Sequence, residues 1–505
     1  MTFGTRSVIP LRLATSVERE FRTMLGYLML VTVAAVVLTG AADVPRDWAR
    51  TLRADAQAYH DQIADNHPGP VNRLDPGFAA RNDAGLALAL RRAAATRDYP
   101  GYLWAMRGYV ASFDDGHVAL DVTQPTSLPI RWPGFLTGFD GAGRQVVMTR
   151  ADDAAVPLGA RLDACDGIPA ERLAARNVGA FRGRWNLVSQ RATNGGRLFL
   201  DAGNPYVARP VRCRFIVGGK PHQVRLDWRA LPDADFDARF AATAPRAHPA
   251  FAARTLADGT HWYTLPGFNG DPGSVDAKAL TPIIAGMRND IDGVAAAPRI
   301  VFDLRGNGGG SSDWSRQIAA ILWGRTAMRA LPSNSDCVDW RASDGNIATL
   351  EGYRATWRNA PEVSQEAKDW ADRIAAGMTG ARGRGEALWR EVDAAETAET
   401  GKGSGPVLAG RVFVLTDWGC GSACLDAVDL WTALGGVHVG QETSADSLYM
   451  DVRQVALPSG FARAVIPMKV YRGRRRGSNV PARPVHAYKG DMRDTAALER
   501  WIARL

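Results

Sequence analysis

Hydrophobic residues recur at helical spacing through residues 46–113, where short HPGP and DYPG segments separate three apolar stripes. From about residue 117 to 230 the pattern changes to short stretches of alternating apolar and polar residues, separated by Gly, Pro and Asp. That alternation is typical of β-strands with one buried face. We therefore predict a helical domain over residues 43–116 and a β-rich domain over residues 117–250.

The rest of the chain, residues 251–505, alternates strands with helices. The apolar PRIVFDLR segment at 298–305 leads through a glycine run into a helical stretch, and RVFVLT at 411–416 is followed by a second one. Repeated strand–helix units build a parallel sheet, because each helix returns the chain to the same edge. We expect an α/β core with a helical insertion at about 325–405.

An uncharged apolar stretch occupies residues 24–42, after four arginines, and ends in small residues. This order is typical of an export signal, so residues 1–42 are predicted to be a signal peptide. Left uncleaved, the stretch is nearly long enough to anchor the chain in a membrane. A buried terminal helix is the less favoured alternative, because it would need enclosure on all sides. The mature chain is expected to be extracytoplasmic, either periplasmic or secreted.

Composition narrows the classes of function. With 505 residues, 46% of them hydrophobic and 23% charged, the chain can build more than one core, which excludes a largely disordered protein. The formal net charge of +8 is a mild excess. Its one dense basic run, RGRRRG at 472–477, is short enough to be a solvated loop, so no nucleic acid partner is expected.

Five cysteines are too few for a disulfide framework and lack the paired spacing of zinc ligands, so no metal or other cofactor is predicted. Export would allow one or two disulfides, and the odd number leaves at least one thiol unpaired. Cys420 and Cys424 lie four residues apart, where a helix gives an unfavourable side-chain geometry for bridging. We predict that these two are reduced packing residues.

Ser422 is the first candidate for chemistry, in the segment DWGCGSACLD at 417–426. It follows an apolar strand and opens a helix, and Gly419 and Gly421 relax the turn so that the hydroxyl can be exposed. A helix N-terminus also offers free backbone N–H groups to an oxyanion. The alternative is that Ser422 is only a helix N-cap, a frequent role of serine.

The segment DLRGNGGG at 303–310 follows a strand and presents consecutive glycine amides that can approach a ligand closely. It lacks the third glycine of a dinucleotide fingerprint, and no GK[ST] follows, so nucleotide binding is not expected. The functional use that remains is donation of a backbone N–H to an oxyanion. The alternative is a tight strand-to-helix turn.

His117 lies in FDDGHVAL at 113–120, where a helix ends and a strand begins. A lone histidine in such a place is usually structural. Among only eight histidines, however, His117 alone lies in a glycine-containing turn flanked by acids. That placement makes it the candidate general base.

These three segments together resemble the C-terminal processing (tail-specific) and tricorn-type serine peptidases. Members carry DGH after an N-terminal helical domain, then DLRxNxGG, then a nucleophile in SAxxD/E, and this chain has all three in that order. Residues 158–175 resemble the middle of a PDZ domain. The resemblance implies a crotonase-like or ClpP-like α/β core, an N-terminal helical domain, a PDZ-like β-rich domain, polypeptide substrates and no cofactor.

The resemblance also implies a role for each matching residue. Ser422 matches the nucleophile, and the backbone N–H of Ala423 matches one oxyanion donor. Gly309 matches the other donor, with Gly308 as the near alternative. His117 matches the general base of the tricorn branch.

Two departures separate this chain from the families it resembles. The processing branch uses a lysine base beyond the serine, where this chain has Ser447. The tricorn branch has a serine before its histidine, where Gly116 stands here, and a late glutamate that the segment RGSNVP lacks. The group that orients the base is therefore open, and the candidates are Asp114, Asp115 and Asn479.

The sequence thus predicts an exported serine peptidase with a histidine base, whose activity falls as pH drops through about 6.5, where imidazole is protonated. The alternative is a catalytically inactive relative that binds peptides or serves as a scaffold, which the missing acid favours. An acyl-CoA enzyme on the related crotonase fold is less favoured, because DGH is not expected there. Substrate preference and oligomeric state stay open.

Overall fold

The computed structural model describes residues 46–505 except 124–127, 141, 245, 272, 333–334, 360–362, 364 and 392–403. The predicted signal peptide or anchor at 1–42 lies outside the described residues. All that follows concerns Arg46–Leu505. Within the ranges described, we find no helix with the length and apolar character needed to cross a bilayer.

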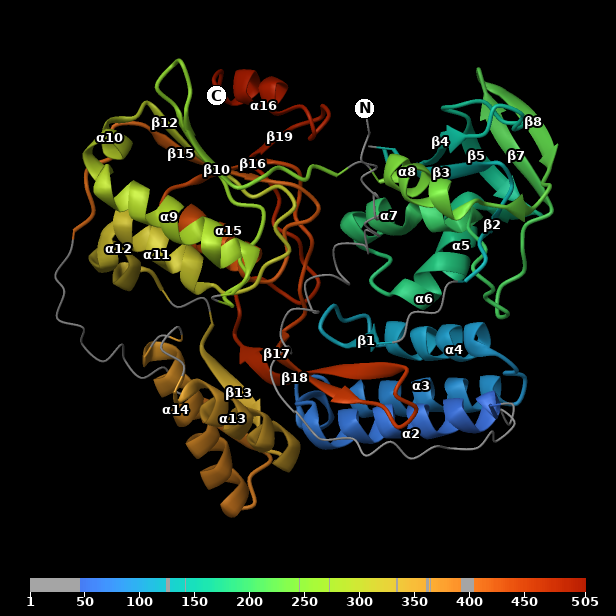
Figure 1. The fold of residues 1–505 in the computed structure, drawn as a ribbon, viewed down its shortest axis with the longest axis horizontal. Helices are drawn as coiled ribbons and strands as arrows, with labels where there is room; N and C mark the ends of the chain where they lie inside the picture. Colours follow the sequence, from blue (N-terminus) through green and yellow to red (C-terminus); the bar gives the residue numbers. More distant parts are fainter. Residues whose placement is uncertain are drawn as a thin grey trace, which may run out of the picture. The chain divides into compact units, whose positions relative to one another are not determined.

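The three apolar stripes of the N-terminal part form three helices. They are α2 (Trp48–Asn66), α3 (Phe78–Ala93) and α4 (Tyr99–Ala111), with the short η1 (Gly69–Val71) after α2. Asp47 and Asp98 cap α2 and α4, because their carboxylates accept backbone N–H groups of the first turns. The buried side chains of the three helices form one cluster with Ile466 and Val470 of strand β18 (Ala462–Arg472). A C-terminal strand, which lies beside the three helices in Figure 1, thus completes the helical core.

Alternating residues in the next part form an antiparallel sheet in the order β3-β4-β5-β7-β8, with β6 beside β5. These strands are β3 (Phe135–Phe139), β4 (Gln145–Arg150), β5 (Arg161–Cys165), β6 (Ile168–Pro169), β7 (Arg212–Val217) and β8 (Lys220–Arg225). Its helical segments are α5 (Ala170–Ala174), η2 (Ala175–Gly179), α6 (Ala180–Arg182), α7 (Val188–Asn194), η3 (Gly195–Phe199) and α8 (Asp233–Thr243), and β2 (Arg131–Trp132) pairs with β9 (Arg229–Ala230). A disulfide between Cys165 and Cys213 joins β5 to β7. The PDZ-like character of this part stays a prediction.

The predicted strand–helix units form a six-stranded sheet in the order β10-β11-β12-β15-β16-β19, parallel except for β10. The strands are β10 (Ala252–Thr255), β11 (His261–Thr264), β12 (Arg299–Asp303), β15 (Arg411–Thr416), β16 (Val437–Gly440) and β19 (His486–Ala487). The helices around it are α9 (Val275–Asn289), α10 (Ile291–Ala296), α11 (Asp313–Leu322), α12 (Gly324–Ala330), α15 (Ala423–Ala433) and α16 (Thr495–Ile502).

Helices cover both faces of this sheet, because successive residues of a strand point to opposite faces. Phe302 of β12 packs with Trp431 of α15, whereas its neighbour Val301 packs with Leu498 and Ile502 of α16. Figure 1 shows α15 and α16 on opposite sides of the sheet. The mixed α/β fold class is thus confirmed.

A third sheet joins distant parts of the chain, with the order β1-β18-β13-β14 and with β17 paired to β18. Its remaining strands are β1 (Ala119–Val122), β13 (Cys337–Arg341), β14 (Leu388–Glu391) and β17 (Tyr449–Ala456). The insertion predicted to be helical contains α13 (Asp344–Trp357) and α14 (Gln365–Gly383), but it also supplies β13 and β14. β1, which follows His117, pairs with β18 from the far end of the chain.

The basic run at 472–477 is not the solvated loop that we predicted. The side chains of Arg474 and Arg476 are only 2% and 6% exposed and form ion pairs with Asp426 and Asp429 at 2.6 and 3.1 Å. Arg474 and Arg476 point inward, whereas Arg475 between them is exposed. These arginines therefore fasten the chain to α15.

Candidate active site

Ser422 lies at the turn between β15 and α15, with φ 52° and ψ −126°. Residues other than glycine rarely adopt this backbone conformation, which costs on the order of 1–3 kcal/mol. Ser422 occupies the N-cap position of α15, yet its side chain makes no capping hydrogen bond. The hydroxyl is thus not used to stabilise the helix, and the strained turn is typical of an exposed nucleophile.

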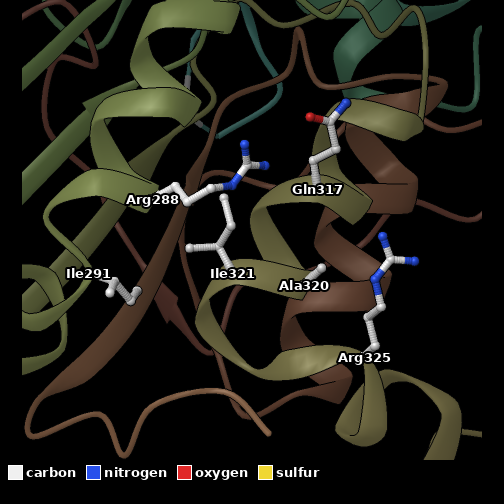
Figure 2. Close-up of a pocket in the computed structure, with 6 residues that line it drawn as sticks. All are labelled: Arg288, Ile291, Gln317, Ala320, Ile321 and Arg325. Atoms are coloured by element: carbon white, nitrogen blue, oxygen red, sulfur yellow. The ribbon is translucent and has the colours of Figure 1, made fainter. Parts of the chain in front are cut away.

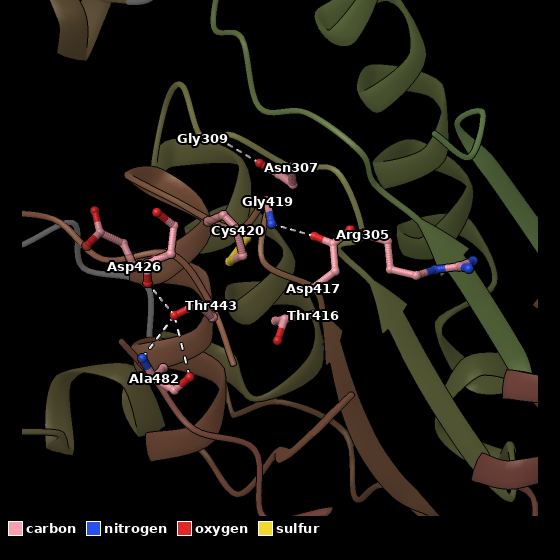
Figure 3. The surroundings of a disulfide bond; sticks show 12 residues. Arg305, Asn307, Gly309, Thr416, Asp417, Gly419, Cys420, Asp426, Thr443 and Ala482 are labelled. Atoms are coloured by element: carbon pink, nitrogen blue, oxygen red, sulfur yellow. Dashed lines mark hydrogen bonds between the residues drawn. A yellow bond between two sulfur atoms is a disulfide. The ribbon is translucent and has the colours of Figure 1, made fainter. Parts of the chain in front are cut away.

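A disulfide between Cys420 and Cys424 brackets Ser422, with 5.4 Å between the Cα atoms (Figure 3). Our prediction that these two cysteines are reduced was wrong. It assumed that both lie on one helix, whereas α15 begins only at Ala423 and the positive φ of Ser422 turns the chain between them. Both cysteines are completely buried, and Cys337 is the free cysteine of the described chain.

The glycine run that follows β12 lies directly on this turn. Gly309 has φ 106°, and a Cβ placed on it would come within 2.6 Å of Ser422 Cβ and 2.8 Å of the Ala423 nitrogen. Those distances are shorter than real Cβ contacts, so only glycine fits here. The fold thus brings three of the predicted site residues together.

Backbone N–H groups around Ser422 differ in whether they are already bonded. The Gly309 N–H donates to the Asn307 side-chain oxygen at 2.9 Å (Figure 3). Within the described part of the chain, the N–H groups of Ala423 and Gly308 have no acceptor. Gly308 is therefore better placed than Gly309 to donate to an oxyanion, while Gly309 supplies the space.

The rest of DLRGNGGG holds the glycine run in place. Asp303 and Arg305 form a fully buried ion pair at 2.5 Å, and Arg305 also donates to the Met492 carbonyl. Asn307 donates to the Leu265 carbonyl at 2.8 Å, and its own carbonyl accepts the Gly421 N–H. Asn307 thus ties the end of β11, the glycine run and the nucleophile turn to one another.

Asp417, at the end of β15, supports the same turn, and the sequence analysis missed it. Its carboxylate accepts the Gly306 N–H at 3.1 Å. It also accepts the Gly419 N–H at 2.8 Å (Figure 3). Burial raises the pKa of Asp417 above its ordinary value, although these two bonds and the charge of Arg246 lower it. The signal available in the sequence was an acid followed by glycines at the end of an apolar strand.

His117 lies in a turn formed by residues 115–117, called the DGH turn below, and the Asp115 side chain stabilises this turn. Asp115 Oδ1 accepts the backbone N–H of His117 at 2.8 Å, and Asp115 Oδ2 accepts the hydroxyl of Ser447 at 2.7 Å. Burial raises the pKa of the Asp115 carboxyl, against the opposing effects of His117, Ser447 and Arg184. Ser447 stands where the resemblance places the lysine base of the processing branch. In this chain that position contacts the DGH turn, through the hydrogen bond from Ser447 to Asp115.

One short segment connects the DGH turn to the nucleophile turn. The Ser444 N–H donates to the Cys420 carbonyl at 2.9 Å, and Ser447, three residues later, bonds to Asp115. Three residues of chain span at most about 11 Å. Among the described residues, however, no hydrogen bond joins His117 to Ser422. The two turns are neighbours, and the histidine and serine do not bond directly.

Two further residues hold the DGH turn from outside: Arg184, which the sequence analysis missed, and Asn479, which it gave as a candidate for orienting the base. Arg184, from the β-rich part, donates its backbone N–H to Asp114 Oδ1 and its guanidinium to the Ala445 carbonyl at 2.6 Å. Asn479 donates its side-chain Nδ2–H to the Asp114 carbonyl at 2.8 Å. The carboxylate and the backbone carbonyl of Asp114 therefore accept hydrogen bonds from Arg184 and Asn479, and neither bonds to His117.

A cavity of about 340 Å³ lies away from this turn, among α9, α10, α11 and α12 (Figure 2). It is lined by Arg288, Ile291, Gln317, Ala320, Ile321 and Arg325. None of the predicted site residues lines it. Over the described ranges, His, Cys, Asp and Glu side chains nowhere form a group of three or more that could hold a metal ion.

Comparisons with known proteins give matches among solved structures only. No family model and no curated protein matches the chain. Mature CPAF matches with a TM-score of 0.58 at 11% identity, covering 90% of this chain and 96% of that chain. The photosystem II D1 C-terminal processing protease matches with a TM-score of 0.32 at 12% identity, covering 87% of this chain and 93% of that one. The tricorn protease matches with 0.39 at 12% identity, covering 90% of this chain and 37% of its own length.

These matches establish a shared fold. The likeness to mature CPAF extends over nearly the whole of both chains, and at 11% identity it shows the fold alone. The other two carry the names of the two peptidase branches that the motifs resemble, at TM-scores that support no further argument. The comparisons therefore show that this chain shares the fold of mature CPAF.

Proposed function

We propose that this chain is a serine peptidase that cleaves polypeptides through Ser422. The observation that carries the proposal is the strained Ser422, whose hydroxyl caps nothing and whose turn lies against the glycine run. Strained backbone is held in place only where the surroundings over-determine it, and such residues gather at active sites. The unbonded Ala423 N–H beside it is the kind of donor that an oxyanion needs.

In this mechanism Ser422 Oγ attacks the carbonyl carbon of a peptide bond, and His117 takes the hydroxyl proton. The N–H of Ala423 holds the resulting oxyanion together with an N–H of the glycine run. We assign that second donor to Gly308, in place of Gly309, because the Gly309 N–H is already bonded. His117 then returns the proton to the leaving amine, and water hydrolyses the acyl-enzyme.

Asp115 contributes charge near the base. Its carboxylate interacts electrostatically with His117 while both of its oxygens accept other hydrogen bonds. A negative charge at this place favours the protonated imidazole that forms during attack. Asp115 therefore supports the base without bonding to its ring.

We further propose that the chain works outside the cytoplasm. Two disulfides support this location, because such bonds persist in oxidising compartments and are rare in the cytosol. The same proposal includes three domains: a helical domain at 43–116, a PDZ-like domain at 117–250 and a crotonase-like or ClpP-like core at 251–505. The PDZ-like domain would bind the polypeptide substrate.

The test is covalent labelling with a fluorophosphonate, together with cleavage of an unfolded polypeptide. The wild-type chain should be labelled at Ser422, and Ser422→Ala should abolish both labelling and cleavage. Ser274→Ala is the matched control, because Ser274 is an N-cap serine whose side chain does accept a helix N–H. That variant should be labelled normally. A folded wild-type chain that is never labelled would favour the peptide-binding scaffold.

A further inference from the structure

Two polar atoms beside the proposed base are enclosed by protein and have no hydrogen-bond partner among the described residues. They are Nδ1 of His117 and Oδ1 of Asn479. A buried polar atom left without a partner costs about 1–3 kcal/mol, so each calls for an explanation. The two are complementary, because a neutral imidazole can donate from Nδ1 and an amide oxygen can only accept.

The orientation of the Asn479 side chain is fixed by its other contact. Its Nδ2 donates to the Asp114 carbonyl at 2.8 Å, which only the nitrogen end of the amide can do. The Asn479 backbone N–H is held as well, by the Asp446 carbonyl at 2.7 Å. Because Asp114 is three residues before His117, the Asn479 amide lies beside the DGH turn with its oxygen still unused.

The other groups of this turn are occupied. Both carboxylate oxygens of Asp115 accept hydrogen bonds, from the His117 backbone and from Ser447. Asp114 accepts the backbone N–H of Arg184 and is otherwise exposed. The Arg184 guanidinium is a donor and bonds to the Ala445 carbonyl. Within the described residues, two buried oxygens near this turn are left without a hydrogen-bond donor, Asn479 Oδ1 and Asp446 Oδ2. Asp446 Oδ2 is 3.9 Å from the Arg476 guanidinium, whereas Asn479 is bonded to the DGH segment itself.

We propose that Asn479 is the positioning residue for His117, and that its Oδ1 accepts a hydrogen bond from Nδ1–H when the site is engaged. This bond would hold the proton on Nδ1 and leave the lone pair of Nε2 free to take the Ser422 proton. An amide fixes the tautomer of His117 without adding a charge. The negative charge that favours the protonated imidazole comes from the Asp115 carboxylate. The catalytic consequence rests on the proposed peptidase function, whereas the tautomer does not.

Asn479 has φ 55°, so the variants must tolerate a positive φ. Asn479→Gly and Asn479→Asp both do so, and both lose the donor to the Asp114 carbonyl. Only Asn479→Asp keeps an oxygen at the Oδ1 position. A difference between these two variants therefore reports the loss of the Oδ1 acceptor, because both variants tolerate the backbone conformation and both lose the hydrogen bond to the Asp114 carbonyl.

The first measurement is the histidine tautomer, by NMR of the full chain labelled with ¹⁵N-histidine, with His117 assigned by its absence in His117→Ala. We expect the Nδ1–H tautomer in the wild type and in Asn479→Asp, and a mixture in Asn479→Gly. The second measurement is the pH profile of peptide cleavage. Asn479→Gly should lower kcat about 100-fold with KM unchanged, since a general base contributes about 10²–10⁴.

Asn479→Asp should retain activity within about 10-fold, and the acid limb of its profile should move to higher pH, because a carboxylate favours the protonated ring. The charged groups that already face this turn are Asp114, Asp115, Asp446 and Arg184, and they are the same in both variants. The same tautomer and the same kcat in Asn479→Gly as in the wild type would overturn the proposal. Failure of the peptidase function itself would look different, since the folded wild type would then show neither labelling nor cleavage, whereas the His117 tautomer would still differ between wild type and Asn479→Gly.

Discussion

Gly309 and Ser422 touch so closely that a single added methyl group at Gly309 would come within 2.6 Å of Ser422 Cβ. The glycine run and the nucleophile turn are 113 positions apart in the sequence, yet each limits the conformation of the other. The run has to approach this closely if one of its N–H groups is to reach an oxyanion formed at Ser422. The contact therefore links a sequence preference for glycine to the proposed chemistry.

Gly309→Ala should abolish fluorophosphonate labelling, because the new Cβ would displace Ser422 and the Ala423 N–H. Gly435→Ala is the matched control, since Gly435 has a similar φ of 101° but faces open space. Both variants carry the cost of a positive φ, on the order of 1–2 kcal/mol. Only the first should lose labelling, as measured by the rate constant for inactivation. Equal labelling rates in the two variants would contradict the role given to this contact.

Ser422→Gly should make the chain more stable while abolishing its labelling. Glycine accepts the positive φ without strain, so we expect a gain of about 1 kcal/mol in the free energy of unfolding. Ser274→Ala should instead lose about 1 kcal/mol, because it removes a true N-cap bond. Urea denaturation measures both. A loss of stability in Ser422→Gly would mean that the hydroxyl is structural after all.

The sequence predicted those parts of the site that depend on local backbone chemistry. A serine after an apolar strand, with glycines before it, predicted the turn at Ser422, and the run at Gly309 predicted a close approach. Both follow from neighbours within a few residues. The strand–helix alternation likewise predicted the parallel sheet, because periodicity is a local property.

What the sequence did not predict depends on contacts across the fold. Ser447 meets Asp115 over 332 positions, and no local pattern marks the pair. Arg184 reaches the DGH turn from the loop between α6 and α7, 70 positions further along the chain, and no local pattern marks this pair either. The Cys420–Cys424 bond was missed because helical spacing was assumed through a turn that Ser422 breaks.

The two disulfides should have different effects when removed. Replacing Cys165 and Cys213 by alanine should cost about 4 kcal/mol of stability, because that bond closes a long loop, and should leave the labelling rate unchanged. Replacing Cys420 and Cys424 should cost about 2 kcal/mol, yet it should slow labelling, because the turn at Ser422 is no longer held.

Peptide mapping without reductant should find both pairs linked and Cys337 as a free thiol. Labelling that slows equally in the two double variants, at a temperature where both are folded, would contradict a specific role for the bond beside Ser422. Free thiols at Cys420 and Cys424 in the native chain would exclude that bond.

His438 should make stability depend on pH between about 6.5 and about 4. Burial lowers the pKa of His438 to about 4, and its Nε2 lies 2.7 Å from Thr416 Oγ1, at the end of the strand that leads to Ser422. In this window the unfolded chain binds a proton at this histidine that the folded chain does not. The free energy of unfolding should therefore decrease as the pH is lowered from about 6.5 to about 4, by about 3 kcal/mol for this group.

Below about pH 4 the folded histidine is protonated as well, and this group causes no further loss. His438→Gln should remove the effect, so the difference in unfolding free energy between wild type and variant should change by about 3 kcal/mol from pH 7 to pH 4. Taking this difference cancels the contribution of His67, a second buried histidine with a lowered pKa. A difference that does not vary with pH would show that His438 is not held neutral.

The identity of the base separates the two branches that this chain resembles. A lysine base must lose its proton near neutral pH, which requires a depressed pKa. Among the lysines of the described residues we consider Lys469, whose side chain is 13% exposed. Burial lowers the pKa of Lys469, but the Asp451 carboxylate 2.7 Å away and Tyr471 outweigh that effect and hold it above the ordinary value. This lysine stays charged and cannot accept the serine proton.

His117→Ala should therefore reduce turnover about as far as Ser422→Ala does, and the double variant should be no worse than either single one. Members of one catalytic unit are not additive, because losing either disables the same step. Replacing each of the six lysines in turn by methionine should spare cleavage. The measurement is kcat of the folded variants. A dead but folded lysine variant, with His117→Ala still active, would assign the base to that lysine and make the DGH turn structural.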